Sequence, residues 1–115
     1  MKTEVNAIGF TLTEALEQYV DRRIRFALGT YSNYLKCVIV RLSDVNGPRG
    51  GHDKCCQIQC ILPGLADVVV EDTTADLYLT INRAASRANR SVARQIKRRQ
   101  SRAFKTGLPR SAMGS

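Results

Sequence analysis

The stretch from residue 76 to residue 102, DLYLTINRAASRANRSVARQIKRRQSR, constrains the fold of this chain more than any other. As a helix of about 100° per residue it has one apolar face and one basic face. The apolar face holds Leu77, Ile81, Ala84, Ala85, Ala88, Val92 and Ile96. The basic face holds Arg83, Arg87, Arg90, Arg94, Lys97 and Arg98. Such a helix needs a sheet to bury one face and suits a polyanion on the other.

The basic face is cationic without interruption, because no acidic residue follows Asp76 in this stretch. Solvated helix faces usually mix the two signs of charge, so plain solvation explains this face less well than a polyanionic partner does. Arg99 and Arg102 fall on the apolar arc, where a charge cannot lie against a core. We therefore expect the helix to have passed its supporting surface by Arg99.

The charge of the whole chain is +8, and it is unevenly distributed. Residues 1–76 hold eight basic and ten acidic residues, whereas residues 77–115 hold ten basic residues and no acidic one. A nearly neutral body with a basic C-terminal part is typical of a nucleic-acid-binding protein. A membrane-surface helix is the alternative, but it would carry bulky apolar side chains where this helix carries mostly alanine.

The length of 115 residues predicts one domain with a modest core, which we place at residues 1–102. Residues 103–115 are expected to form a flexible basic tail. No apolar run approaches the roughly 18 residues needed to cross a membrane. The N-terminus has no signal-peptide core, so we expect a cytoplasmic protein.

The four cysteines, Cys37, Cys55, Cys56 and Cys60, are interpreted as reduced thiols that serve as small core residues. A zinc site that combines His52 with Cys55 or Cys56 and Cys60 is the alternative. Its spacing matches no structural-zinc pattern, and the chain holds one histidine. We expect no metal and no cofactor.

Residues 11–28 predict the first helix, in which Leu16, Val20, Ile24 and Ala27 recur at helical spacing. Either Thr11 or Thr13 is expected to cap its start, and Gly29 is placed to end it. Two arginines, Arg22 and Arg25, suit either the helix dipole or an RNA contact. Arg23 lies at the edge of the apolar face, from which its side chain can reach a partner.

Four strands complete the predicted fold. The first lies within residues 3–10, and two strongly alternating ones lie within residues 36–44 and 54–62. Pro63 and Gly64 form a turn before the last strand, at residues 65–72. The order β-α-β-β-β-α predicts an α+β fold, a four-stranded sheet with both helices packed on one face.

Two segments between these elements, one glycine-rich and one acidic, could be mistaken for catalytic sites. The glycine-rich segment NGPRGG at residues 46–51 is too short for a phosphate-binding P-loop, although Arg49 and Lys54 could contact RNA there. A group of acidic residues, Glu71, Asp72 and Asp76, is expected near the N-terminus of the second helix, with Thr73 or Thr74 as its cap. We interpret these acids as structural rather than as a catalytic pair.

Several of these segments together resemble the ribosome hibernation-promoting factor and ribosome-associated inhibitor family. The resemblance covers residues 3–102 and rests on FTLTEALEQYVDRRI, VIVRLSD, the Pro-Gly turn and VEDTTADLYLTINRA followed by the basic helix. Its most specific part is Asp76-Leu77-Tyr78 with Ile81-Asn82. The resemblance implies a fold like that of a double-stranded-RNA-binding domain. It also implies binding to ribosomal RNA of the small ribosomal subunit, in the channel of messenger and transfer RNA, which keeps idle ribosomes inactive under stress.

Carried over position by position, the resemblance assigns RNA contacts to Arg23, Arg87, Arg90, Arg94 and Arg98. The roles of Arg83, Lys97 and Arg22 rest on the helix faces alone. The chain also resembles the short, single-domain form of the family, some members of which favour ribosome pairing and others oppose it. We expect a monomer away from the ribosome, without a small-molecule substrate and without membrane contact.

Two other classes of function compete with this one. A protein-interaction modulator, for example of the transcription machinery, predicts binding that ribonuclease treatment leaves unchanged. An enzyme is the poorest interpretation, because the chain has one histidine, no nucleophile motif and no paired carboxylates in a pocket-like context.

Overall fold

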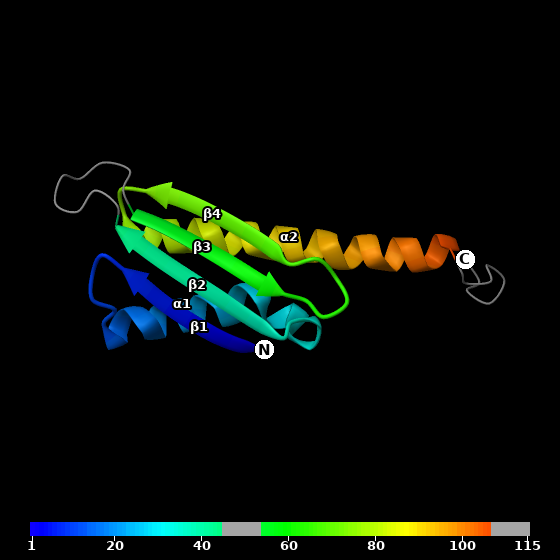
Figure 1. Cartoon of the computed structure of the whole chain (residues 1–115), viewed down its shortest axis with the longest axis horizontal. Helices are drawn as coiled ribbons and strands as arrows, with labels where there is room; N and C mark the ends of the chain where they lie inside the picture. Colours follow the sequence, from blue (N-terminus) through cyan, green and yellow to red (C-terminus); the bar gives the residue numbers. More distant parts are fainter. Residues whose placement is uncertain (45–53, 107–115) are drawn as a thin grey trace.

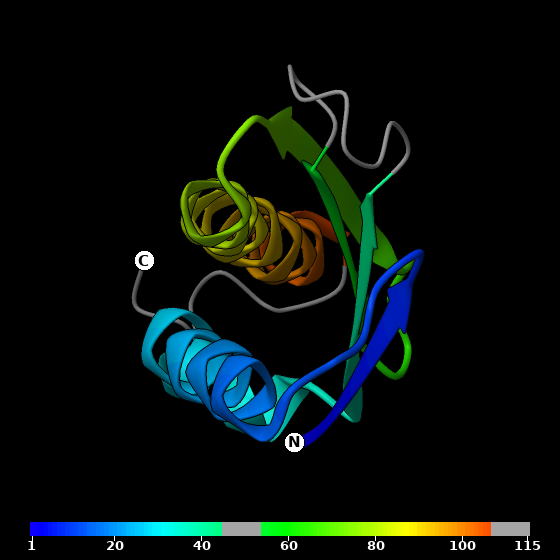
Figure 2. The same cartoon turned by 90° about the vertical axis from the view of Figure 1, so that its left-hand side faces the viewer.

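The computed structural model describes residues 1–44 and 54–106, with side chains as far as Gln100. Its elements are β1 (Lys2–Ile8), α1 (Glu14–Leu28), the 3-10 helix η1 (Gly29–Tyr34), β2 (Cys37–Asp44), β3 (Lys54–Ile61), β4 (Val68–Thr74) and α2 (Leu77–Thr106). Both helices lie side by side on one face of the sheet, and the other face is open (Figure 2). The predicted α+β fold, β-α-β-β-β-α, is confirmed.

The four strands form one sheet in the order β1-β2-β3-β4. β1 pairs with β2 in parallel, which is possible because α1 carries the chain back across the sheet between them. The pairs β2–β3 and β3–β4 are antiparallel, so these three strands form a meander. In this register Val38 lies opposite Cys60 and Val40 opposite Ile58, so the buried side chains of neighbouring strands share one face.

The core fills the space between that face and the two helices. The predicted apolar face of α2 forms one wall of it, with Ile81, Ala84, Ala85, Ala88 and Val92 all fully buried. Small alanine side chains let a helix backbone approach a sheet closely, which explains why this face carries so few bulky residues. From α1, the fully buried Val20, Ile24 and Leu28 complete the core.

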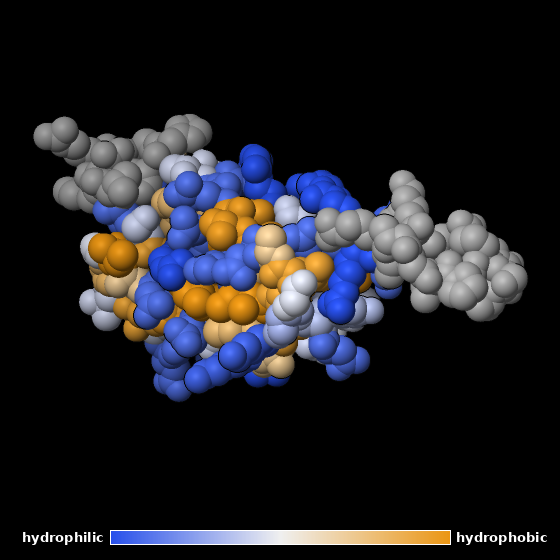
Figure 3. Space-filling model, turned by 45° about the vertical axis from the view of Figure 1, so that its right-hand side comes forward, coloured by the Kyte–Doolittle hydropathy of each residue, from blue (hydrophilic) through white to orange (hydrophobic). Residues whose placement is uncertain are grey.

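The open face of the sheet is partly polar. Arg41 Nη1 donates to the Oε1 atoms of Gln57 and Gln59 on the neighbouring strand, at 3.1 and 3.3 Å. Hydrophobic and hydrophilic surface alternate in the view of Figure 3. This mixture is consistent with the alternation of polar and apolar residues along β2 and β3.

Helix α2 begins differently from the prediction, which placed its cap at Thr73 or Thr74. Asp76 is the capping residue: its Oδ1 accepts from the Tyr78 N–H at 3.0 Å, and its carbonyl oxygen accepts from Thr80. Thr74 acts one step earlier, because its hydroxyl oxygen accepts from the Asp76 N–H. Thr73 and Thr74 belong to β4 and lie three or more residues before Leu77, the first residue of α2, so neither directly precedes the helix.

At its other end α2 continues beyond the sheet (Figure 1). Among the side chains described, which end at Gln100, Ile96 is the last buried one of α2, and residues 97–100 are all exposed, as the position of Arg99 on the apolar arc predicted. The helix runs to Thr106, four residues into the segment expected to be a tail. Residues 107–115, the remainder of that segment, lie outside the described residues.

Both ends of α1 and the turn at Gly64 show how local sequence controls the backbone. Thr13 caps α1 by accepting from the Leu16 N–H at 3.2 Å. Gly64 has φ of +83° in the turn closed by the Leu65 N–H and the Leu62 carbonyl, a conformation that glycine adopts without strain. Gly29 does end α1, but with φ of −58°, because the chain continues into η1 instead of reversing through a left-handed residue.

Some predictions depend on residues that the structure does not describe. The NGPRGG segment with Arg49, and His52 of the alternative zinc site, lie within residues 45–53. The four cysteines are free thiols, and Cys56 and Cys60 are fully buried in the core. Within residues 1–44 and 54–106, no helix is long and apolar enough to cross a membrane.

Candidate nucleic-acid interface

The basic face of α2 is exposed along its whole described length. All six predicted side chains are accessible to solvent: Arg83, Arg87, Arg90, Arg94, Lys97 and Arg98. They are held in one row because the opposite face of the same helix is buried against the sheet, which fixes the rotation of α2 about its axis. The backbone positions of these six residues are therefore fixed relative to one another.

One carboxylate lies against this row, and the sequence pattern within α2 did not show it. Asp72 of β4 is buried, and its Oδ2 accepts from Arg83 Nε at 2.9 Å and lies 3.4 Å from Arg87 Nε. The prediction that Asp72 lies near the start of α2 is wrong, because α2 runs back over β4, and Asp72 therefore contacts Arg83 and Arg87 in its second and third turns.

These contacts lower the pKa of Asp72. Burial on its own would raise the pKa, but the hydrogen bonds from Arg83 and from the Thr73 N–H, with the charges of Arg83 and Arg87, hold it below its ordinary value. Asp72 is therefore ionised at neutral pH. It offsets part of the positive charge at the start of the row, although about half of the side-chain surface of Arg83 and of Arg87 stays exposed, at 54% and 52%.

The positive charge is concentrated further along α2. Within the part of the chain described, Arg90, Arg94, Lys97 and Arg98 form no ion pair with a carboxylate. Arg90 occupies the central place, because it borders three adjoining hollows of about 350, 290 and 370 Å³. Arg98 borders another hollow, beside the Pro63-Gly64 turn.

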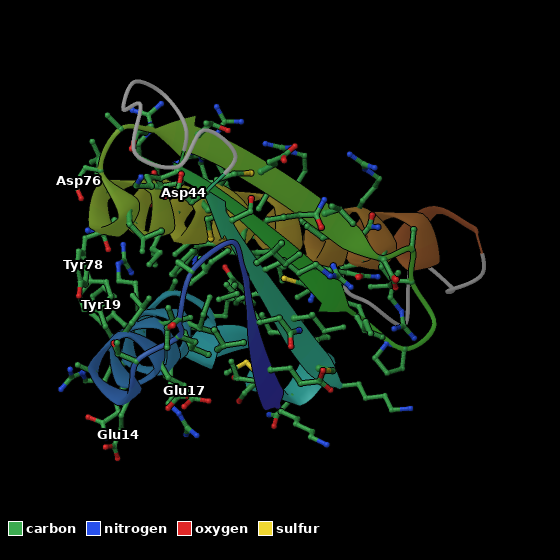
Figure 4. All side chains as sticks on the ribbon, turned by 60° about the vertical axis from the view of Figure 1, so that its left-hand side comes forward. Glu14, Glu17, Tyr19, Asp44, Asp76 and Tyr78 are labelled. Carbon is green, nitrogen blue, oxygen red and sulfur yellow. The ribbon has the colours of Figure 1, made fainter. Side chains whose placement is uncertain are left out.

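Arg23 of α1 is the one predicted residue of the first helix that meets this surface. Its Nε donates to Asn82 Oδ1 of α2 at 3.0 Å, and the same oxygen accepts from the Tyr19 hydroxyl at 2.7 Å. Tyr19 also packs edge to face against Tyr78, with ring centroids 4.8 Å apart, and the two rings meet between the helices in Figure 4. These contacts tie α1 to α2 and hold the Arg23 side chain in a fixed position.

Arg22 and Arg25 are not brought to the row. Arg22 borders a hollow of α1 and β1 together with Glu14, Glu17 and Asp21, which makes its surroundings acidic. Arg25 pairs with Asp21 one helical turn earlier, at 2.8 Å. The structure therefore favours a helix-stabilising role for Arg25 and separates Arg22 from the other predicted RNA contacts.

The sequence analysis assigned no role to three residues at the junction of the helices. Asn82 and Tyr19 connect α1 to α2. Asn82 belongs to the motif that carries the family resemblance, but neither the motif nor the charge of these residues identifies their partners. Phe26 is 83% exposed beside Arg23. A signal for Phe26 did exist, because it lies off the apolar stripe of its own helix.

Comparison with known proteins identifies a family and a shared fold. A family model described as Sigma 54 modulation protein / S30EA ribosomal protein matches residues 3–100. No curated protein sequence matches the chain significantly.

Two solved structures share the fold. The N-terminal domain of Thermus thermophilus Protein Y superposes with a TM-score of 0.65 at 28% sequence identity, over 82% of this chain and 98% of that domain. A ribosomal subunit interface protein from Coxiella burnetii superposes with a TM-score of 0.69 at 12% identity, over 82% of this chain and 96% of its own. At that identity the second likeness shows the fold alone.

Proposed function

This chain belongs to the Sigma 54 modulation protein / S30EA ribosomal protein family, a family of ribosome-associated proteins rather than of enzymes, and on that premise we propose that it silences translation by binding the small ribosomal subunit. In this proposal the protein occupies the channel of messenger and transfer RNA. It binds there through the basic face of α2 and through Arg23 of α1.

The observation that carries the proposal is the sheet-backed row of cations on α2. Arg87, Arg90 and Arg94 are spaced by three and four residues, so one face of the helix presents them to one surface. Each arginine that neutralises a phosphate releases counterions, which makes such an interface strong at low salt and weak at high salt. A fixed row suits a folded RNA, whose phosphates are also fixed in space.

The proposed mechanism is steric occlusion. A helix of 30 residues extends about 45 Å, and α2 is stiffened by the sheet along most of that length. A body of this kind excludes other ligands from a channel without undergoing a chemical step. The proposal therefore assigns no catalytic residue and no cofactor, and places the protein with the ribosomes in the cytoplasm.

Sedimentation through a sucrose gradient with purified small subunits tests the proposal, at one low and one high salt concentration. The protein should migrate with small subunits at low salt and be released at high salt. Added transfer RNA should compete with it for the channel. Failure to migrate with small subunits at any salt concentration would contradict the proposal.

Two controls separate the competing interpretations. Binding to cellular partners that survives ribonuclease treatment would favour a protein-interaction modulator instead. Light scattering of the free protein should return the mass of one chain, and a dimer mass at low concentration would contradict the expected monomer.

A further inference from the structure

Phe26 is the most exposed of the large hydrophobic side chains in the described residues, at 83%. It stands on α1 beside α2, and the core does not explain it. One face of its ring is occupied, because the Arg23 guanidinium carbon lies 5.5 Å from the ring centroid in a cation–π contact. With so much of the side chain exposed, the other face of the ring is open to a planar ligand.

Arg23 is positioned to serve the same ligand. Its Nε is fixed by Asn82, whereas its Nη1 is shielded from solvent and has no hydrogen-bond partner among the described residues. A shielded donor without a partner is unfavourable, and an acceptor that reaches it removes that cost.

The two side chains border a hollow of about 290 Å³ between the helices, and the opposite wall comes from α2. That wall contributes Arg90, Ser86 and Asn89. Asn89 Nδ2 donates to the Ala27 carbonyl oxygen at 2.6 Å, which uses one of its two N–H groups and leaves Oδ1 as an acceptor for a ligand. The hollow lies at the lower end of the size range of ligand pockets, which fits one small planar group.

We propose that this hollow is a subsite for one unstacked nucleotide of single-stranded RNA. Its base stacks on the open face of Phe26, and its phosphate lies between Arg23 and Arg90. The inference rests on the proposed function and specifies it: the row on α2 binds phosphates regardless of sequence, whereas this subsite selects a position where a base is turned out of its stack.

An RNA nucleotide explains the composition of the site better than a protein side chain does. Arg23 and Arg90 border the same hollow as the exposed ring of Phe26. A hydrophobic partner would remove water from both charges without offering them a hydrogen bond in its place. A nucleotide matches both parts, because its base covers the ring and its phosphate pairs with the charges.

The first test places a fluorescent reporter at the subsite. The chain contains no tryptophan, so Phe26→Trp introduces one reporter at an exposed position. Its emission should be quenched when the variant binds purified small subunits, because a stacked base quenches indole. Val69→Trp is the matched control, since Val69 is also exposed, at 54%, on the strand β4 rather than at the helix junction. Its emission should not change.

The second test separates stacking from charge. Phe26→Ala should weaken binding to small subunits roughly five- to hundredfold, the range expected for the loss of one base–aromatic stack. The salt dependence should stay the same, because no charge is lost. Phe26→Tyr keeps a ring and should bind like the parent protein.

Several outcomes would overturn the inference. They are unchanged emission of a Phe26→Trp variant that sediments with small subunits, equal quenching in the Val69→Trp control, or parental affinity of Phe26→Ala. A blue shift without quenching would indicate a protein side chain on the ring and would equally overturn it. If the parent protein itself fails to sediment with small subunits, the proposed function fails, and the subsite fails with it.

Discussion

Asp72 on β4 and Arg83 on α2 are joined by a hydrogen bond of 2.9 Å between Oδ2 and Nε. Since Arg87 Nε lies 3.4 Å from the same oxygen, one carboxylate serves two arginines of the cationic row. Strand β4 therefore neutralises the arginines of α2 unequally. Arg83 and Arg87 are partly neutralised, whereas Arg90 and Arg94 present their full charge.

This difference in neutralisation predicts the effects of single substitutions on binding to small subunits. Arg90→Ala and Arg94→Ala should each lower the log–log salt dependence by about one unit, and Arg83→Ala should lower it less. The combined change of Arg87, Arg90 and Arg94 to alanine should lower it by up to about three units. Sedimentation across a salt series measures these slopes.

The fold should survive these changes, because exposed substitutions typically alter stability by within about 0.5 kcal/mol each. Lys2→Ala, which removes one exposed charge from β1, is the control and should leave the slope unchanged. A folded triple variant that binds like the parent at every salt concentration would remove the row from the mechanism.

Replacement of Asp72 with asparagine should separate stability from binding. The amide keeps the size of the side chain but loses the charge that holds Arg83 and Arg87, so stability should fall by about 1–3 kcal/mol. Binding at low salt should strengthen, because both arginines become available to phosphates. Urea denaturation and sedimentation measure the two effects.

Glu71→Gln provides the matched control for that substitution. It removes the same charge from the adjacent residue of β4, but Glu71 contacts Cys55 on the open face of the sheet rather than α2. Equal effects of the two substitutions would mean that the overall charge, and not the contact with Arg83, controls binding.

The same carboxylate predicts a pH dependence of stability. The pKa of Asp72 is held below the ordinary value of 3.8, so the folded state binds the proton more weakly than the unfolded state does. The ionised Asp72 carboxylate therefore contributes to the stability of the fold. This contribution is complete above pH 3.8, and it is lost as the pH falls below that value through the lower pKa of the folded state. Urea midpoints between about pH 7 and about pH 3 should fall less in Asp72→Asn than in the parent. An identical fall would contradict the assignment.

The core thiols should be chemically inert in the folded protein. Burial is the main cause that raises the pKa of Cys56 and of Cys60 to about 12. The thiolate is the reactive form, so an aromatic disulfide reagent at about pH 8 should leave both residues unlabelled until urea is added. Mass spectrometry of the labelled peptides reads the result. Rapid labelling of Cys60 in the native protein would show that the core opens on the timescale of labelling.

Much of the fold could be predicted because its signals are local. The alternation of Val38, Val40 and Leu42 specifies a half-buried strand by itself, and the spacing of Ile81, Ala84 and Ala88 specifies the buried face of α2. Such periods are properties of one segment, so they do not depend on which element packs against it. The structure confirms both.

The sequence could not reveal contacts between segments. Asp72 pairs with Arg83 because β4 packs against α2. Asn82 accepts a hydrogen bond from Arg23, which lies 59 residues earlier in the chain. The cap of α2 was misplaced for a related reason, since Asp76, Thr74 and Thr73 are all suitable capping residues and only the end of β4 chooses among them. Arg23 is half-buried at the edge of the apolar face of α1, as predicted, whereas its contact with RNA stays a prediction.

The end of the buried stripe at Ile96 has a consequence for local unfolding within a single helix. Amide hydrogens around Ala84 and Ala88 are protected by the sheet and should exchange with solvent only when the whole domain unfolds. From Lys97 onward the helix relies on its intrinsic propensity, which sustains isolated helices poorly in water. Hydrogen–deuterium exchange should therefore rise steeply within two turns after Ile96. A bound polyanion that holds Lys97 and Arg98 would slow exchange in this overhang first, and would leave the protected half of α2 unchanged.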